Sequence, residues 1–363
     1  MISISLCMIV KNEEDVIGRC LDTVRDIVDE IVIVDTGSTD RTKEVVSEYT
    51  DRIFDFEWIN DFSAARNFAF AQATQEYLLW MDADDILKPE DQEKLRILKR
   101  SLDKKIDAAS MLYILATDDA GNVTGSSRRY RLVKREKGFR WIGFVHEYLE
   151  VHGNLIDTDM AITHASLRHD SNRNITIFEE MIAKGRSFSP RDMYYYANEL
   201  FDHGKRRKAI EQYTEFLDSK QGWVEDNIRA CHRLSDCYAH FEEKAKSLEW
   251  LFQALRYDAP RSETCCRVGN FFFEQNNYLA AIYWYDQAIQ CKDHGMLAIR
   301  TDVYSAWIPL LQLCVSYDKI GEHEKGCYYN EQAAKLRPKD PIVIGNREYF
   351  SKVLKREIVP ATY

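Results

Sequence analysis

The sequence predicts two domains of different class, an α/β domain followed by an all-α domain of helical repeats. Three observations lead to this prediction. Short apolar runs alternate with helix patterns up to about residue 165, which is typical of a sheet whose strands are joined by helices. From residue 173 onward, apolar residues recur only at helical spacing. The length of 363 residues also suits two domains of roughly 100–200 residues each.

We expect the α/β domain at residues 1–170 and a linker helix within 171–190, its pattern spanning 175–186. We expect the repeats at 191–345 and a C-terminal tail at 346–363. The 49 basic and 59 acidic residues leave a net charge of −10, which argues against nucleic acid as the main partner.

Targeting signals are not expected in this sequence. No apolar run approaches the roughly 18 residues of a transmembrane helix, and no signal-peptide pattern follows Met1. The nine cysteines form no C-x-x-C pair and several stand in apolar or helical patterns, which favours reduced thiols. These features predict a cytoplasmic protein.

The first strands and helices follow one another at regular spacing. Strands are expected at 4–10, 30–35 and 52–56, and the second is almost wholly β-branched and ends in Asp35. Helices are expected after each of them, around 16–24, from about residue 40, and at 63–73. Because helices of this kind connect parallel strands, we expect a parallel sheet.

The most informative stretch is 77–85, with the sequence Tyr-Leu-Leu-Trp-Met-Asp-Ala-Asp-Asp. Its apolar half is typical of a buried strand, which would deliver the acids to the sheet edge where α/β folds bind ligands. Asp82 and Asp84 supply hard oxygen ligands, which suit a divalent cation that also holds phosphate oxygens. An acidic turn or helix cap is the simpler alternative for an isolated D-x-D pair.

Other polar residues are predicted at the same edge. Lys11-Asn12-Glu13 follows the first strand, Asp35 ends the second, and Arg66 lies on the helix before the acidic strand. Asp35 could accept from a base NH or a ribose hydroxyl, and Arg66 could grip a diphosphate or a base carbonyl. The alternatives are a helix-capping role for Asp35 and a surface ion pair for Arg66.

Four motifs in order, at 8–14 (Met-Ile-Val-Lys-Asn-Glu-Glu), 31–42, 61–67 and 80–84, resemble those of family 2 glycosyltransferases. The resemblance covers about the first 90 residues. It implies a GT-A fold, a nucleotide-sugar donor and inversion of the anomeric centre.

The resemblance also implies roles for individual residues. Asp35 would hold the nucleoside base, and Arg66 would touch the base or the diphosphate. Asp84 would be the main ligand of Mg²⁺ or Mn²⁺, with Asp82 on the ribose or on a metal-bound water. The same motifs place further residues in the donor site: Val10, Asn12, Glu13 and Ala83.

On the acceptor side we expect a strand at 107–115, a hairpin turn at 118–122 leading to 123–127, and a basic strand at 127–135. A solvated edge strand is the favoured interpretation of the basic stretch, because positive charge there discourages aggregation. The alternative is a patch for donor phosphates or an acidic acceptor.

The segment 139–147 is interpreted as an aromatic strand that ends in His146-Glu147. An inverting transfer needs a base for the acceptor proton, and we choose Glu147, with His146 second. A satisfied histidine and a surface glutamate are the alternative. The block resembles one in family 2 enzymes that carry helical repeats.

A short strand is expected at 161–165. By resemblance to many GT-A enzymes, His164 would complete the metal shell, with His169 as a weaker candidate. Imidazole suits Mn²⁺ better than Mg²⁺. A purely structural histidine is equally open.

Four helical hairpins then fit the tetratricopeptide pattern of about 34 residues. Small or aromatic residues recur at matching positions, such as Gly269 and Tyr285, whereas Asp236 departs from the pattern. Longer steps between repeats predict extended helices or loops, for example at 291–295. The aromatic runs at 194–196 and 283–285 are interpreted mainly as packing between repeats, with a peptide groove or a self-association surface as alternatives.

The combination resembles the sublancin-type peptide glycosyltransferases, which glycosylate Cys or Ser side chains of small bacteriocins. The prediction is a metal-dependent inverting transferase that moves a hexose, by default from UDP-glucose, to a Cys or Ser/Thr side chain of a peptide or protein. Homodimerisation through the repeats is a further expectation. The alternatives are a glycan or lipid-linked acceptor in envelope assembly, and a non-catalytic repeat scaffold.

Overall fold

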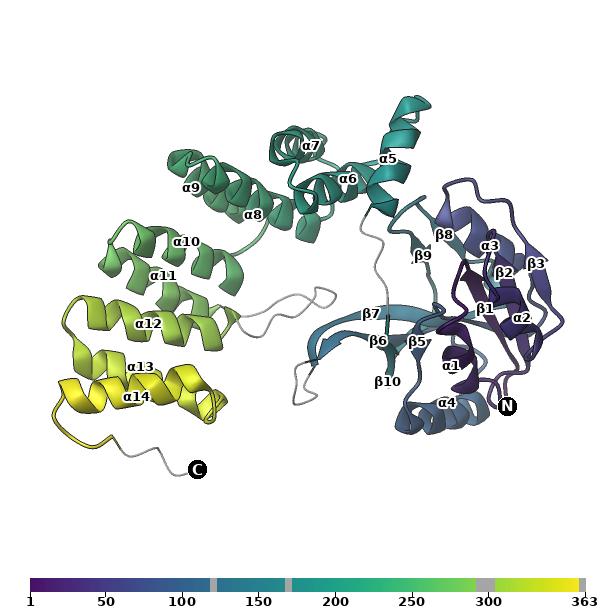
Figure 1. Cartoon of the computed structure of the whole chain (residues 1–363), viewed down its shortest axis with the longest axis horizontal. Coiled ribbons are helices and arrows are strands. Elements are labelled where there is room, and N and C mark those ends of the chain that lie inside the picture. The colour runs from purple at the N-terminus through teal and green to yellow at the C-terminus, as the bar shows by residue number, and fades with distance from the viewer. Residues whose placement is uncertain (118–122, 167–171, 292–303, 359–363) are drawn as a thin grey trace. The chain divides into compact units, whose positions relative to one another are not determined.

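The computed structural model describes residues 1–117, 123–166, 172–291 and 304–358 (Figure 1). The chain divides into two compact units, Met1–Ser187 and Phe188–Tyr363. The turn expected at 118–122, the weaker candidate His169 and most of the loop expected at 291–295 lie outside the described residues.

The first four predicted strands form the parallel half of an eight-stranded sheet. Their order is β3-β2-β1-β4, and each pairing in it is parallel. Their bounds are β1 (Ile4–Val10), β2 (Glu30–Asp35), β3 (Ile53–Asp55) and β4 (Tyr77–Trp80). The predicted α/β architecture is confirmed here, because the connecting helices bring the chain back to the same edge before each new strand.

The expected parallel pairing holds for β3, β2, β1 and β4, whereas the rest of the sheet is mixed. The order continues from β4 as β7-β6-β10-β5. The bounds are β5 (Asp85–Ile86), β6 (Ala108–Thr117), β7 (Val123–Lys134) and β10 (Leu155–His164). β7 runs antiparallel to both β4 and β6, and β5 runs antiparallel to β10. The short β6–β7 connection is the reason, since parallel neighbours need a long crossover.

The basic strand is the clearest correction. Residues 123–134 form one continuous strand, β7, and it lies between β4 and β6 instead of at an edge. The interpretation as a solvated edge strand is therefore wrong. Arg131, at its centre, is fully buried.

The predicted aromatic strand ends earlier than expected. β8 (Arg140–Ile142) pairs with β9 (Tyr148–Glu150) in a separate two-stranded sheet. Gly143 (φ 95°) and His146 (φ 52°) take left-handed backbone conformations between them. His146 and Glu147 therefore lie in a loop, and the left-handed geometry at a non-glycine residue is an unusual backbone conformation.

Helices cover both faces of the large sheet. On one face Leu6 and Met8 of β1 pack with Leu21 and Leu95, from α1 (Ile17–Asp22) and α4 (Pro89–Ser101). On the other face Cys7 packs in a cluster that includes residues of α3 (Phe62–Gln72). The alternation of β1 side chains between two covered faces explains why this strand is apolar except for Ser5. Helix α2 (Thr42–Ser47) joins β2 to β3.

The second unit consists of antiparallel helix pairs, which confirms the four predicted hairpins within the described residues. Their bounds are α6 (Pro190–Asp202), α7 (Arg206–Asp218), α8 (Val224–His240), α9 (Lys244–Gln253), α10 (Ser262–Glu274), α11 (Tyr278–Gln290), α12 (Trp307–Lys319) and α13 (His323–Leu336). A further helix, α14 (Pro341–Val353), crosses the boundary expected at residue 345 between the repeats and the tail. Helix α5 (Arg173–Ala183) belongs to the first unit. The short 3-10 helices are η1 (Arg135–Lys137) and η2 (Ala254–Arg256).

Close packing of small against aromatic residues joins each helix pair. A Cβ added to Gly269 on α10 would lie 2.6 Å from the ring of Tyr285 on α11. That ring is fully buried and its hydroxyl donates to Asn270. Asp236, the residue that departs from the repeat pattern, instead forms an ion pair with Arg267 at 2.8 Å.

The aromatic runs are divided between core and surface. Tyr194, Tyr196 and Tyr285 are buried, as the packing interpretation predicts, whereas Tyr283 is 58% exposed. Among the helices that the structure describes, none combines the length and apolarity that crossing a membrane would require.

Two helical glycines allow a matched test of the repeat packing. Alanine normally stabilises a helix over glycine by about 1 kcal/mol, and Gly345 on α14 has open space around it. We expect Gly345→Ala to raise the free energy of unfolding by up to about 1 kcal/mol. Gly269→Ala should lower it by about 1–3 kcal/mol, because the methyl group overlaps the Tyr285 ring. Urea denaturation followed by circular dichroism measures both, and stabilisation by Gly269→Ala would contradict this packing.

Candidate active site

The carboxyl ends of β1, β2 and β4 bring predicted residues to one edge of the sheet. The backbone N–H of Thr36 donates to the carbonyl of Val10, which joins the ends of β1 and β2. A cavity of about 600 Å³ opens at this edge. Among its lining residues are Lys11, Asn12, Glu13, Thr36 and Asp84.

Asp35 is 1% exposed and is not among the residues that line the cavity, although its neighbour Thr36 is. Its Oδ1 accepts hydrogen bonds from the backbone N–H groups of Gly37 and Ser38 at 3.0 and 2.9 Å. These bonds hold the turn after β2, whereas helix α2 begins only at Thr42, so Asp35 does not cap that helix. Its Oδ2 is buried and has no hydrogen-bond partner among the described residues. Since buried polar atoms are rarely left unsatisfied, this oxygen is suited to accept a hydrogen bond from a ligand.

Asn12 joins the loops that follow β1 and β2. Its Oδ1 accepts from the backbone N–H of Thr39, and its own N–H donates to Ser38 Oγ. Its left-handed backbone (φ 57°) makes this double contact feasible. Val10 and Ala83 are buried in the adjacent core, so only their backbone groups are available to a ligand.

Arg66 forms a buried ion pair with two carboxylates. Its Nη2 donates to Asp82 Oδ1 at 2.7 Å and its Nε donates to Glu147 Oε1 at 2.6 Å. The rings of Trp80 and Trp141 lie 5.0 and 4.8 Å from the guanidinium carbon. A surface ion pair, the alternative considered for Arg66, is excluded because the residue is only 9% exposed.

These contacts determine the charge on Asp82. Burial would raise the pKa of this carboxyl, but Arg66 and Arg131 lower the pKa to about 2. Asp82 is therefore ionised at neutral pH, and its Oδ1 is directed at an arginine.

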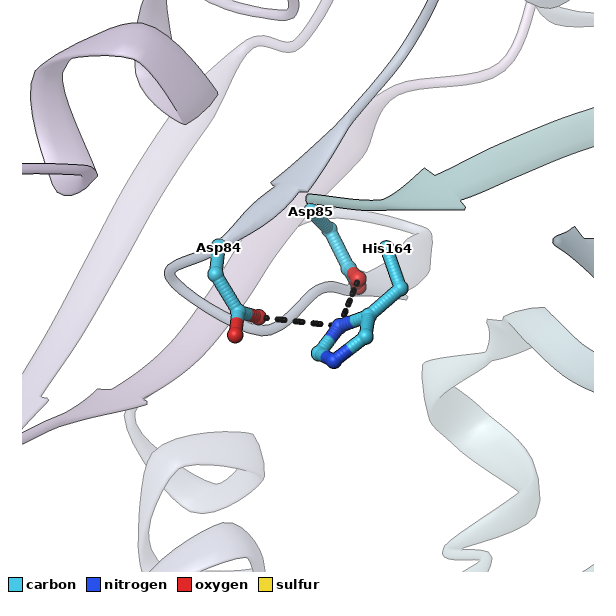
Figure 2. Close-up of side chains that lie close together, drawn as sticks. All are labelled: Asp84, Asp85 and His164. Carbon is cyan, nitrogen blue, oxygen red and sulfur yellow. Dashed lines mark ion pairs between the residues drawn. The ribbon is translucent and has the colours of Figure 1, made fainter. Parts of the chain in front are cut away.

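Three side chains converge where β5 meets the end of β10 (Figure 2). His164 Nδ1 lies 3.4 Å from Asp84 Oδ1 and 3.8 Å from Asp85 Oδ1, and the ligand atoms of the three residues lie within 4.8 Å of one another. Two carboxylates and an imidazole are a donor set that fits Mn²⁺ or Mg²⁺. Of the predicted ligands, the structure groups Asp84 with His164, adds Asp85, and directs Asp82 to Arg66.

The surroundings of His164 favour a positive charge at this point. The carboxylates of Asp84 and Asp85 raise the pKa of His164 to about 10. The Tyr113 hydroxyl lies 3.0 Å from the same Nδ1. A divalent cation bound here would replace the imidazole proton, because metal ligation requires the neutral ring.

Asp85 and Arg131 were not predicted as site residues, yet they hold the acidic loop in place. Asp85 Oδ2 accepts from the backbone N–H of Asp82 at 3.0 Å and lies 3.1 Å from Arg131 Nη1. The guanidinium of Arg131 lies between the rings of Trp80 and Tyr113, at 3.7 and 4.4 Å. No signal in the sequence sets Arg131 apart, because it stands among other arginines in the basic stretch 127–135.

Glu13 lines the cavity close to the acidic group. Burial first, and then the charge of Asp84, raise the pKa of Glu13 to about 7 although Arg173 lowers it. Its backbone N–H donates to Thr42 Oγ1. The two candidate bases are placed differently: Glu147 is held by Arg66, and neither Glu147 nor His146 is among the residues that line the cavity.

Residues 5–169 match the family model described as Glycosyl transferase family 2. This segment is a family 2 glycosyltransferase domain. It contains the large sheet, the acidic loop and most of the cavity lining.

Three relatives show similarity over different lengths. A TPR repeat-containing protein of Synechococcus elongatus is 29% identical over 80% of this chain and 66% of its own. The SPbeta prophage-derived glycosyltransferase SunS of Bacillus subtilis is 28% identical over 60% of this chain and 56% of its own. The lipopolysaccharide core biosynthesis glycosyltransferase LpsC of Rhizobium meliloti is 30% identical over 42% and 58%. The chain thus covers between 56% and 66% of the length of these relatives.

The buried ion pair between Arg131 and Asp85 should matter for the stability of the fold. Arg131→Met should lower the free energy of unfolding by about 3–5 kcal/mol, because it leaves the Asp85 carboxylate buried without a counter-charge. Adding Asp85→Asn should recover part of this loss. A double-mutant cycle in urea measures the coupling, expected to be at least about 1 kcal/mol, and additive effects would show that the two charges do not interact.

Proposed function

We propose that this protein is a metal-dependent inverting glycosyltransferase that moves a hexose from a nucleotide sugar, UDP-glucose by default, to a Cys or Ser/Thr side chain of a peptide or protein such as a bacteriocin. One observation carries the proposal. Asp84, Asp85 and His164 converge at the edge of a family 2 domain, and Asp84 also lines a cavity of about 600 Å³. That volume suits a small-molecule donor.

The site residues divide the work of binding the donor. Asp35 Oδ2 accepts from the nucleobase or ribose, and Asn12 orders the loop beside it. Asp84 and His164, with Asp85, hold the cation, which supplies charge neutralisation for the leaving diphosphate when it is bound. Arg66 fixes Asp82, whose remaining oxygen is available to the ribose or to a water on the cation.

Glu147 is the first candidate for the base that accepts the acceptor proton, and His146 is the second. A proton and the Arg66 guanidinium compete for the carboxylate of Glu147, since Nε lies 2.6 Å from Oε1. Proton transfer to Glu147 therefore requires the free oxygen or a loosened ion pair. His146 lies in the adjoining loop in a left-handed conformation, as residues at functional sites often do.

A peptide acceptor is supported by the similarity to SunS and by the helical repeats, which offer the extended surfaces that peptides bind. The similarity to LpsC, named for lipopolysaccharide core biosynthesis, favours the second candidate, a glycan or lipid-linked acceptor. The intact acidic group argues against a non-catalytic scaffold. A cytoplasmic location and homodimerisation through the repeats stay predictions.

The test is incubation of the purified protein with UDP-glucose and related donors, Mn²⁺ or Mg²⁺, and either a Cys- and Ser-containing peptide or a glycan acceptor. Nucleotide release measures turnover, and mass spectrometry identifies the product. A hexose on the peptide supports the first candidate, and a hexose on the glycan supports the second. Failure to release nucleotide from any donor would contradict both.

Asp84→Ala should lower turnover by about 100-fold or more, because loss of a ligand weakens cation binding. Removal of metal with EDTA should abolish turnover, and added Mn²⁺ should restore it. Asp159→Asn is the matched control, since this carboxylate is 86% exposed on β10, the strand that carries His164. Equal turnover in Asp84→Ala and the control would rule out a catalytic role for the acidic group.

A further inference from the structure

The cavity extends beyond the family 2 domain onto helix α5. The family match ends at residue 169, yet α5 begins at Arg173 and contributes to the same lining as Asp84. The lining residues from α5 are Arg173, Thr176, Ile177 and Glu180. The segment that matches family 2 therefore does not complete the cavity alone.

Side-chain contacts anchor α5 to the first unit. Asn60 Nδ2 donates to Glu180 Oε2 at 2.5 Å, and the rings of Phe178 and Phe144 lie 5.2 Å apart. Phe178 is fully buried. These contacts make α5 a wall of the cavity and give its side chains defined positions there.

Among the α5 residues that line the cavity, Arg173 has no evident role in stabilising the fold. It is exposed, and its side chain makes no hydrogen bond or ion pair within the described part of the chain. Its guanidinium carbon lies 4.9 Å from the ring centroid of Phe62, a contact of modest strength at an exposed site. Arg173 is also the first residue of α5, and its positive charge is unfavourable there because the helix dipole favours anions at the N-terminus.

The charges around the cavity indicate what Arg173 could bind. Lys11 and Arg173 are the basic residues of the lining, and Arg173 acts electrostatically on Glu13, which in turn interacts with Asp84. Arg173 therefore faces the region beside the candidate cation site. A nucleoside diphosphate carries more negative charge than one divalent cation neutralises, and a guanidinium matches phosphate oxygens in a fork geometry.

We propose that Arg173 binds the diphosphate of the nucleotide-sugar donor from helix α5. This inference rests on the proposed function. In the transfer, Arg173 would stabilise the charge that develops on the leaving nucleoside diphosphate, and Asp84, Asp85 and His164 would hold the cation that neutralises part of it. The donor site is then built from the family 2 domain and α5 jointly.

Titration of the full-length protein with UDP in the presence of Mn²⁺ tests this assignment, with uridine as the probe that lacks phosphates. Arg173→Gln should weaken UDP binding about 10- to 100-fold, the usual worth of charge-assisted hydrogen bonds, and leave uridine binding unchanged. Arg173→Lys should lie between the two, because it keeps the charge and loses the fork. Lys184→Gln at the other end of α5, outside the lining, is the control and should match the unaltered protein.

Three results would overturn the inference. Arg173→Gln could bind UDP as the unaltered protein does, or it could lose uridine and UDP binding equally, which would indicate a role in the base site or in folding. Circular dichroism of each variant checks the fold. Absence of binding of UDP and other nucleoside diphosphates to the unaltered protein would instead overturn the proposed function together with this inference.

Discussion

The acidic loop depends on one constraint, that charges buried beneath it must be compensated. Arg131 is fully buried, and Asp85 is the carboxylate that lies 3.1 Å from it. Asp85 in turn accepts from the backbone N–H of Asp82 and stands opposite His164 in the β5–β10 pairing. A buried pair of this kind contributes little net stability, but it sets the positions of the side chains around it.

Pairing with buried arginines also separates the carboxylates into those bound inside the protein and those available to a ligand. Asp82 and Glu147 share Arg66, so one positive charge compensates part of the charge of the two carboxylates. Asp84, Asp85 and His164 remain grouped where a cation could bind. Asp35 keeps one buried oxygen without a hydrogen-bond partner. The polar groups that a ligand can use are therefore those that the internal ion pairs leave over.

The segment that matches family 2 ends before the last residues that line the cavity. The family match stops at residue 169, whereas the first compact unit continues to Ser187 and includes α5. This helix has an apolar side with buried Ile177 and Phe178, and a polar side that reaches the cavity. Part of the cavity lining therefore comes from a helix that follows the segment matched to family 2.

The sequence by itself determined the strands β1, β2 and β4, the acids that follow them, and the four helix pairs. Each of these is encoded locally, by a buried apolar run or by small and aromatic residues at repeat spacing. Only the tertiary structure decided that β7 is internal, that Arg131 meets Asp85, and that Glu147 is held by Arg66. These contacts join residues 46 and 81 positions apart, and strand order across a sheet is set by long-range pairing that no local pattern records.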